Sequence, residues 1–261
     1  MNQHNGCMCA QDEQFAMQEA WDRASDLYLA RRGDDVGSVS YGNLAPTEAE
    51  LALLGDLRGK RVLDIGCGGG HNAVACALAG AKVMGVDISS VQLAAAQRLA
   101  EEHGVSVEWL QKDGLARAGW AEHSFDLILA IQTLPYIRDA VTVIGSARQL
   151  LRPGGMLVVS LDHPLRNCFY DEEMEELSPF PVRGYDDDAS MLWKFAADAP
   201  MQTYHYPLGV WISWLLEAGF ALQRVIEASA PVDICDDLWP EDSPLAPLRN
   251  IPHTAILVAS V

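Results

Sequence analysis

A glycine-rich turn between two short apolar runs constrains this chain more than any other feature. Residues 61–87 read RVLDIGCGGGHNAVACALAGAKVMGVD: an apolar run, a glycine cluster at 66–70, a small-residue stretch that ends at Gly80, and a second apolar run that ends on Asp87. This order predicts a strand, a glycine turn, a helix and a second strand. Glycine permits positive φ and a close approach of the backbone to a ligand, and the first N–H groups of the helix have no helical partner. The pattern therefore predicts a ligand site at this turn.

Two acidic residues of the unit indicate the kind of ligand. Asp87 lies about twenty residues beyond the turn, where a carboxylate accepts two hydrogen bonds from a ribose diol. Asp64 stands two places before Gly66, where it would repel a diphosphate but not a ligand with an ammonium or sulfonium charge. The spacing Gly66-x-Gly68-x-Gly70 also differs from GxGxxG, although a nicotinamide-binding domain stays open as the alternative.

These residues resemble the first motif, (D/E)xGxGxG, of the class I S-adenosylmethionine-dependent methyltransferases. The resemblance continues in unbroken order from Arg61 to Leu161, through Asp87, Asp113 and the segment LRPGG at 151–155. It implies a doubly wound (Rossmann-like) α/β fold with a seven-stranded, mainly parallel sheet of order 3-2-1-4-5-7-6, in which strand 7 is antiparallel. It also implies S-adenosyl-L-methionine as cofactor and S-adenosyl-L-homocysteine as product.

The resemblance assigns cofactor contacts to positions of this sequence. It implies that Asp113 accepts a hydrogen bond from the adenine amine, that the next backbone N–H reaches a ring nitrogen, and that Tyr41 caps the methionine moiety. Gln132 follows the apolar run 125–131 at the carboxyl edge of the sheet, where ligands of open α/β sheets bind. The expected cofactor residues are Tyr41, Asp64, Gly66, Cys67, Gly68, Asn72, Asp87, Ile88, Gln92, Asp113, Gly114, Leu115 and Gln132.

The chain length of 261 residues accommodates one α/β domain with insertions. A helical pattern from Asp12 to Arg32 predicts a helix that covers the cofactor cleft, as in the resembling enzymes, or packs on the sheet edge. The predicted parts are an N-terminal helical cap (1–57), the cofactor-binding core (58–162), a lid or substrate insertion after strand five (163–206), and the C-terminal part of the core (207–261) with a loop insertion (230–250). A long aromatic and acidic insertion in a compact domain indicates a functional role.

Two histidines are the predicted catalytic bases. His163-Pro164 after strand five and Tyr204-His205 before a helix resemble a subgroup of bacterial small-molecule methyltransferases, although Tyr206 stands where that subgroup usually has Arg. Histidine titrates near neutrality, which suits a base. An alcohol, phenol or carbon acid needs such a base, whereas a neutral amine often does not. The alternative for His163 and His205 is a hydrogen-bonded structural role.

Composition excludes several classes of partner. The formal net charge of −18 opposes sequence-independent binding to nucleic acids. Apolar runs stay below the ~18 residues that a membrane span needs, and the first residues lack the pattern of a signal peptide. The six cysteines are scattered, which is typical of reduced, cytoplasmic thiols. No spacing predicts a metal site, and a monomer or a homodimer is expected.

The function expected from the sequence is methyl transfer to an oxygen, nitrogen or carbon atom of a small-molecule acceptor, a metabolite or natural product. The acidic lid favours a cationic or amine acceptor. Three alternatives stay open: a methyltransferase-like protein that retains the cofactor structurally and catalyses a non-methylating reaction such as cyclisation, a module that senses the cofactor, and a nicotinamide oxidoreductase.

Overall fold

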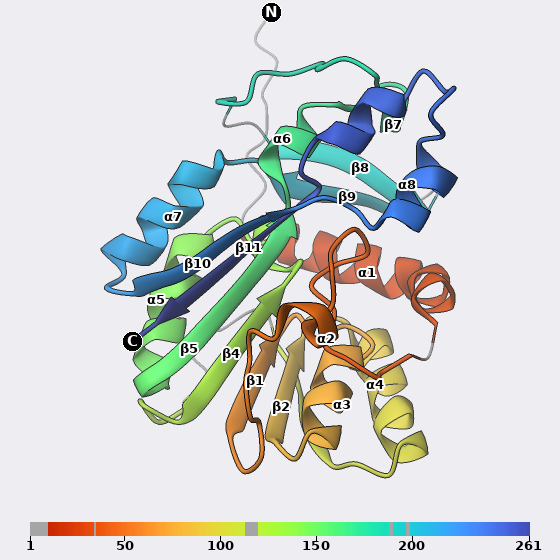
Figure 1. The fold of residues 1–261 in the computed structure, drawn as a ribbon. Coiled ribbons are helices and arrows are strands. Elements are labelled where there is room, and N and C mark those ends of the chain that lie inside the picture. Colours follow the sequence, from red (N-terminus) through yellow and green to blue (C-terminus); the bar gives the residue numbers. More distant parts are fainter. Residues whose placement is uncertain (1–9, 34, 113–119, 188–189, 197–198) are drawn as a thin grey trace, which may run out of the picture.

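A twisted seven-stranded sheet forms the centre of the computed structural model, which describes residues 10–33, 35–112, 120–187, 190–196 and 199–261 (Figure 1). The strand order is β10-β11-β5-β4-β1-β2-β3. The C-terminal strand β11 runs antiparallel to both β5 and β10, and the other pairs are parallel. The order and the antiparallel strand predicted from the sequence are therefore confirmed. The strands are β1 (Arg61–Ile65), β2 (Lys82–Asp87), β3 (Val107–Gln111), β4 (Phe125–Ile131), β5 (Leu151–Asp162), β10 (Ala221–Ala228) and β11 (Thr254–Ser260).

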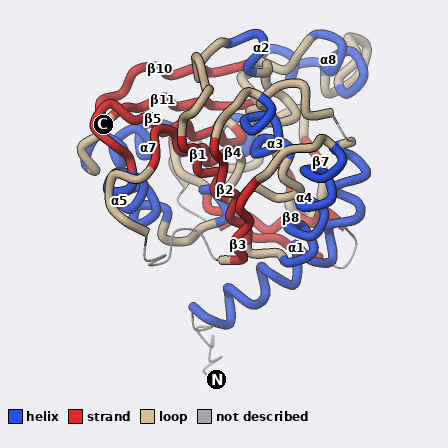
Figure 2. The backbone as a smooth tube through the Cα atoms, turned by 90° about the horizontal axis from the view of Figure 1, so that it is seen from below, coloured by secondary structure: helices blue, strands red, loops and turns tan. Residues whose placement is uncertain are grey.

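Apolar side chains cover both faces of the sheet, as continuous apolar strands predict. Ile128 of β4 belongs to a buried cluster that includes residues of α5 (Ala140–Leu150) and α7 (Leu208–Glu217). Its neighbours Leu127 and Leu129 belong to a second cluster, which includes residues of α3 (His71–Leu78). Because side chains alternate along a strand, the two clusters lie on opposite faces. Figure 2 shows the strands as a layer between helices.

The connections follow the expected local chemistry. Ser89 caps α4 (Ser90–Glu102) by accepting a hydrogen bond from the Gln92 amide. Thr47 forms a capping box with Glu50 at the start of the short helix α2 (Glu48–Leu51). The helix stops because the Glu48 carboxylate accepts hydrogen bonds from the amides of Leu53 and Leu54. The segment LRPGG loops out of the β4–β5 pairing, whose register jumps from Leu151 to Met156.

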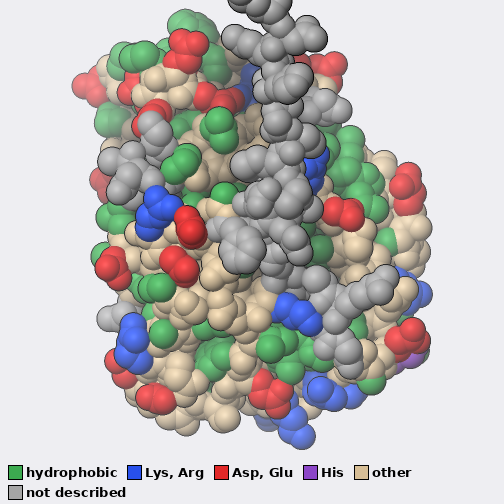
Figure 3. Space-filling view, turned by 180° about the vertical axis from the view of Figure 1, so that it is seen from behind, with side chains coloured by type: hydrophobic (Ala, Val, Ile, Leu, Met, Phe, Trp, Pro, Cys, Tyr) green, Lys and Arg blue, Asp and Glu red, His purple; other side chains and the backbone are tan. Residues whose placement is uncertain are grey.

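The N-terminal helix and the insertions gather at the end of the sheet where β1, β2, β4 and β5 finish (Figure 1). Helix α1 (Ala10–Arg32) contacts α4 and the hairpin of β8 (Ser190–Ala196) and β9 (Ala199–Tyr204). The rest of the insertions comprises α6 (Pro164–Asn167), β6 (Tyr170–Asp171), β7 (Glu176–Leu177), α8 (Val232–Leu238) and the short helix η2 (Ala246–Asn250), while η1 (Leu134–Tyr136) follows β4. Acidic side chains are visible on this end of the molecule in Figure 3.

The packing of the glycine turn makes a prediction about stability. Gly70 has φ +82°, and a Cβ atom there would lie 2.7 Å from the Ala96 Cβ and 2.8 Å from Trp109. We expect Gly70→Ala to lower the free energy of unfolding by about 2–4 kcal/mol, because backbone strain and overpacking add. Urea denaturation measures the change.

Gly145→Ala is the matched control, since Gly145 lies inside α5 and a Cβ atom added there would meet no other atom within 4 Å. There the substitution should stabilise by about 0.5–1 kcal/mol. Equal stability of the two variants would contradict the packing described for the turn.

Candidate functional site

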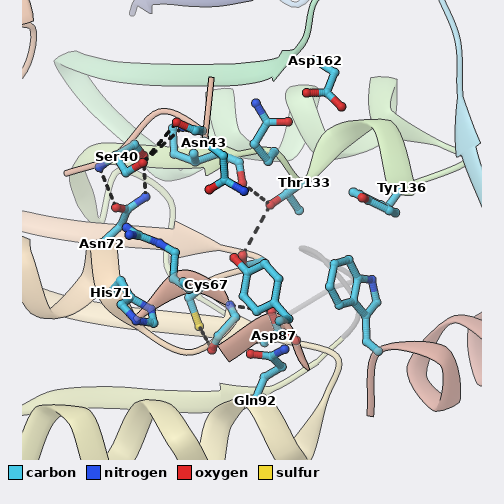
Figure 4. Close-up of a pocket in the computed structure, with 18 of the residues that line it drawn as sticks. Ser40, Asn43, Cys67, His71, Asn72, Asp87, Gln92, Thr133, Tyr136 and Asp162 are labelled. Atoms are coloured by element: carbon cyan, nitrogen blue, oxygen red, sulfur yellow. Dashed lines mark hydrogen bonds between the residues drawn. The ribbon is translucent and has the colours of Figure 1, made fainter. Parts of the chain in front are cut away.

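A cavity of about 600 Å³ opens where the carboxyl ends of β1, β2, β4 and β5 meet, beneath α1. Its volume lies within the ~300–1,000 Å³ typical of small-molecule sites. One half of its wall is polar and comes from the glycine turn, the loop around Ser40 and the start of α4 (Figure 4). The other half is largely aromatic and comes from α1, η1 and the β8 strand. One cavity thus joins two chemically different halves.

The glycine turn brings backbone to the cavity where side chains would block it. Gly66, Gly68 and Gly70 all have positive φ. A Cβ atom on Gly66 would lie 2.4 Å from the Thr133 Oγ1 and Cγ2 atoms. The Thr133 hydroxyl donates to the Ile65 carbonyl at 2.9 Å, which ties the end of β4 to the end of β1. The turn therefore needs glycine both for its conformation and for its packing.

Asp87 closes the turn from the next strand. Its Oδ2 atom accepts a hydrogen bond from the Gly68 amide at 2.8 Å, and its Oδ1 atom accepts one from the Ser89 amide at 2.9 Å. The Ser89 hydroxyl donates to the Asp22 carboxylate of α1 at 2.5 Å. Burial raises the pKa of Asp87, and its hydrogen bonds from backbone amides act in the opposite direction. Asp87 is thus fixed on the cavity wall with lone pairs still available to a diol.

Asp64 lies beneath the turn and is 2 % exposed. The Ala73 amide donates to its carboxylate, whereas Oδ2 has no hydrogen-bond partner among the described residues. Burial raises the pKa of Asp64 to about 8, and the nearby Asp87 carboxylate adds to this shift. Both polar atoms of the Gln92 side chain also lack partners there. Buried polar atoms of native proteins rarely stay unpaired, so these groups fit a ligand with a cationic and hydrogen-bonding end.

Asn72 and Gln132 hold the loop on the far side of the polar half (Figure 4). Asn72 Oδ1 accepts from the Ser40 amide at 2.9 Å, and its Nδ2 donates to the Ser40 carbonyl at 3.0 Å. Gln132 Nε2 donates to the Tyr41 carbonyl and the Ser160 hydroxyl, both at 3.4 Å. Gln132 also adopts φ +55°, a strained backbone for a residue other than glycine and one often found at ligand sites.

Most of the predicted cofactor residues surround the same cavity. The residues of that prediction that line it are Asp64, Gly66, Cys67, Gly68, Asn72, Asp87, Ile88, Gln92 and Gln132. Tyr41 is different: its side chain is fully buried and its hydroxyl donates to Glu48 Oε2 at 2.6 Å, so the ring packs in the core while Ser40 and Gly42 line the cavity. Asp113, Gly114 and Leu115 lie outside the described residues.

The two predicted bases, His163 and His205, are not among the cavity-lining residues. His163 Nδ1 accepts from the Leu165 amide, so its Nε2 carries the proton and donates to Glu227 at 2.8 Å. His205 pairs its Nε2 with the Tyr185 carbonyl at 3.1 Å. Burial lowers the pKa of both rings. Both are buried groups with structural contacts, as in the alternative that the sequence left open, and their catalytic role stays a prediction.

The aromatic half holds residues that sequence patterns did not assign to the site. Trp21, Tyr136 and Trp193 line the cavity together with the carboxylate of Asp162 and the guanidinium of Arg166. Trp21 lies in the helix predicted over 12–32, Trp193 lies in the predicted insertion 163–206, and Tyr136 follows the apolar run 125–131. Within the described ranges, no group of three or more His, Cys, Asp or Glu side chains forms a metal site. No helix there is long and apolar enough to span a membrane.

Comparison with known proteins gives consistent results. A family model described as a methyltransferase domain matches residues 62–155. The ubiquinone biosynthesis O-methyltransferase of Pseudomonas fluorescens (strain SBW25) is 40 % identical over 105 residues, which are 40 % of this chain and 45 % of that protein. The chain thus spans about half the length of the curated relatives it matches.

Solved structures extend the similarity to the whole fold. An S-adenosylmethionine dependent methyltransferase from Mesorhizobium loti is 26 % identical, with a TM-score of 0.64 over 82 % of this chain and 96 % of that one. The 1,6-didemethyltoxoflavin-N1-methyltransferase of Burkholderia thailandensis has a TM-score of 0.63 over 99 % of this chain and 92 % of that one, at 16 % identity. The sheet order, the glycine turn with Asp64 and Asp87, and these similarities support a class I S-adenosylmethionine-dependent methyltransferase with S-adenosylmethionine as its cofactor.

Proposed function

We propose that this chain transfers the methyl group of S-adenosylmethionine to a small-molecule acceptor, at an oxygen, nitrogen or carbon atom. The observation that carries the proposal is the single cavity that joins the glycine turn to the aromatic half. Asp87 would hold the ribose diol, and Asp64 with the glycine turn would hold the amino-acid end. When bound, the cofactor supplies a methyl group on a positively charged sulfur, which is reactive without further activation.

The side chains of the aromatic half supply position and a dry environment. Trp21, Tyr136 and Trp193 would hold the acceptor against the polar half, and α1 would exclude water above it. Fixing two reactants in this way contributes roughly 7–11 kcal/mol to lowering the barrier. Asp162 is the carboxylate of this half and can take a proton from an acceptor that must lose one.

Isothermal titration with S-adenosylhomocysteine tests the cofactor site, and mass spectrometry of mixtures with S-adenosylmethionine tests transfer. We expect binding, and we expect S-adenosylhomocysteine to form with at least one member of a panel of amines, phenols and carbon acids. Absence of binding by both cofactor forms would refute the proposal. An acceptor that is converted without gaining a methyl mass would instead identify the cyclisation alternative.

A further inference from the structure

We propose that the aromatic half of the cavity binds an ammonium group, so that the methyl acceptor is an amine. This inference rests on the proposed function and names the acceptor class for the same site. It is carried by three aromatic rings that line the cavity together with an acidic side chain.

The three rings form inclined walls. The centroids of Trp21 and Tyr136 are 5.3 Å apart at an interplanar angle of 67°, and those of Tyr136 and Trp193 are 6.0 Å apart at 53°. Inclined aromatic walls are the arrangement that binds methylated ammonium groups through their π faces.

The rings are supported from behind. Trp21, Tyr136 and Trp193 pack on a buried cluster of Ala20, Ala24 and Met201, which joins α1 to β9. Met201 and Ala24 are fully buried. The rings therefore keep their mutual angles without a ligand, which reduces the entropy that binding has to offset.

One carboxylate, which is paired with Arg166, stands beside the rings. Asp162 lines the cavity with its side chain half exposed; its Oδ2 accepts from Arg166 at 3.1 Å, which leaves lone pairs of the carboxylate available to a ligand. Its negative charge raises the pKa of the neighbouring Tyr136 hydroxyl, although burial is the larger cause. The cavity's other cations, Arg31, Arg32 and Lys112, come from the C-terminal end of α1 and the end of β3, beside the polar half.

The chemistry of nitrogen methylation suits this half. The lone pair of the amine forms the new N–C bond while the C–S bond breaks and leaves its electron pair on sulfur, so the nitrogen becomes positively charged. An acceptor bound as its ammonium first gives one N–H proton to Asp162, which frees the lone pair that attacks the methyl carbon. Rings and a carboxylate that attract a cation thus stabilise the charge that develops on the acceptor.

Two probes of equal shape isolate the charge. Choline and 3,3-dimethylbutan-1-ol differ in having a positively charged nitrogen or a neutral carbon at the same position. We expect choline to bind the protein saturated with S-adenosylhomocysteine at least about tenfold more tightly than the neutral alcohol, in calorimetric or NMR titrations. This comparison uses the unmodified chain. Equal affinities, or no binding of choline at millimolar concentration, would overturn the proposal.

Variants identify the residues. Trp193→Leu keeps apolar volume but removes the π face, so it should weaken choline about tenfold and leave the alcohol nearly unchanged. Trp120→Leu is the matched control, because Trp120 contacts Phe125 and does not line the cavity. Asp162→Asn should weaken choline several-fold. If the unmodified chain binds S-adenosylhomocysteine but not choline, the amine acceptor is refuted and the proposed function stands. If the unmodified chain does not bind S-adenosylhomocysteine, the proposed function itself is refuted.

Discussion

Asp87→Ala is expected to weaken S-adenosylhomocysteine binding by at least about 100-fold. A carboxylate that accepts two hydrogen bonds from a diol contributes about 1.5–3 kcal/mol per bond, and each ~1.4 kcal/mol is tenfold in affinity. The variant also removes the acceptor of the Gly68 amide, so the turn itself loses support. Both effects lower the affinity for S-adenosylhomocysteine. Titration calorimetry on the two proteins measures the difference.

Glu108→Ala provides the control for Asp87→Ala. Glu108 is an exposed carboxylate on the neighbouring strand β3, so its removal changes the net charge equally without touching the cavity. Its affinity for S-adenosylhomocysteine should equal that of the unmodified chain. An unchanged affinity in Asp87→Ala, with the folded state verified by circular dichroism, would rule out the assigned cofactor site.

The second large effect concerns pH and the ligand-free protein. The pKa of Asp64 is about 8 in the folded chain against an ordinary value of 3.8, so the unfolded chain releases this proton at a much lower pH. Between these values unfolding releases a proton, and the free energy of unfolding falls by up to ~1.4 kcal/mol for each pH unit. Between pH ~6.5 and ~8 we therefore expect a loss of about 2 kcal/mol. Urea denaturation at several pH values measures it.

This pH window separates Asp64 from the buried histidines. Burial lowers the pKa of His163, His205 and His253, so these rings cost stability only as the pH falls below their ordinary value of ~6.5. Above pH ~6.5 the buried carboxylates determine how the free energy of unfolding changes with pH. The pKa of Asp87 is also raised, so Asp87, like Asp64, lowers this free energy as the pH rises. Asp64→Asn keeps the size of the side chain and should flatten the slope. A steep loss of stability that persists in this variant would show that Asp64 is not its source.

The core of the fold and the polar half of the cavity were predictable because local sequence determines them. Gly66, Gly68 and Asp87 act through backbone conformation and strand ends, which a short motif specifies. The sheet order followed from the resemblance over 61–161 and the apolar C-terminal segment. The glycine turn and the strand ends depend on residues that are close in sequence, so a sequence pattern can predict them.

The aromatic half was not predictable, since it depends on contacts between distant segments. Trp21, Tyr136 and Trp193 meet only because α1, η1 and the β8–β9 hairpin pack together. The direction of the Tyr41 side chain likewise depends on Glu48, which its buried hydroxyl contacts. The direction of the His163 ring depends on the short helix α6, which it caps. Sequence patterns do not specify where a loop side chain points.

The hydrogen bond between Asp22 and Ser89 connects the covering helix to the floor of the cavity. Ser89 donates from its amide to Asp87 and from its hydroxyl to Asp22, while a Cβ atom on Gly68 would lie 3.8 Å from the Tyr28 ring of the same helix. We therefore expect a ligand that binds Asp87 to stabilise the packing of α1 on the cavity. By thermodynamic reciprocity, stabilising this packing raises the affinity for the ligand.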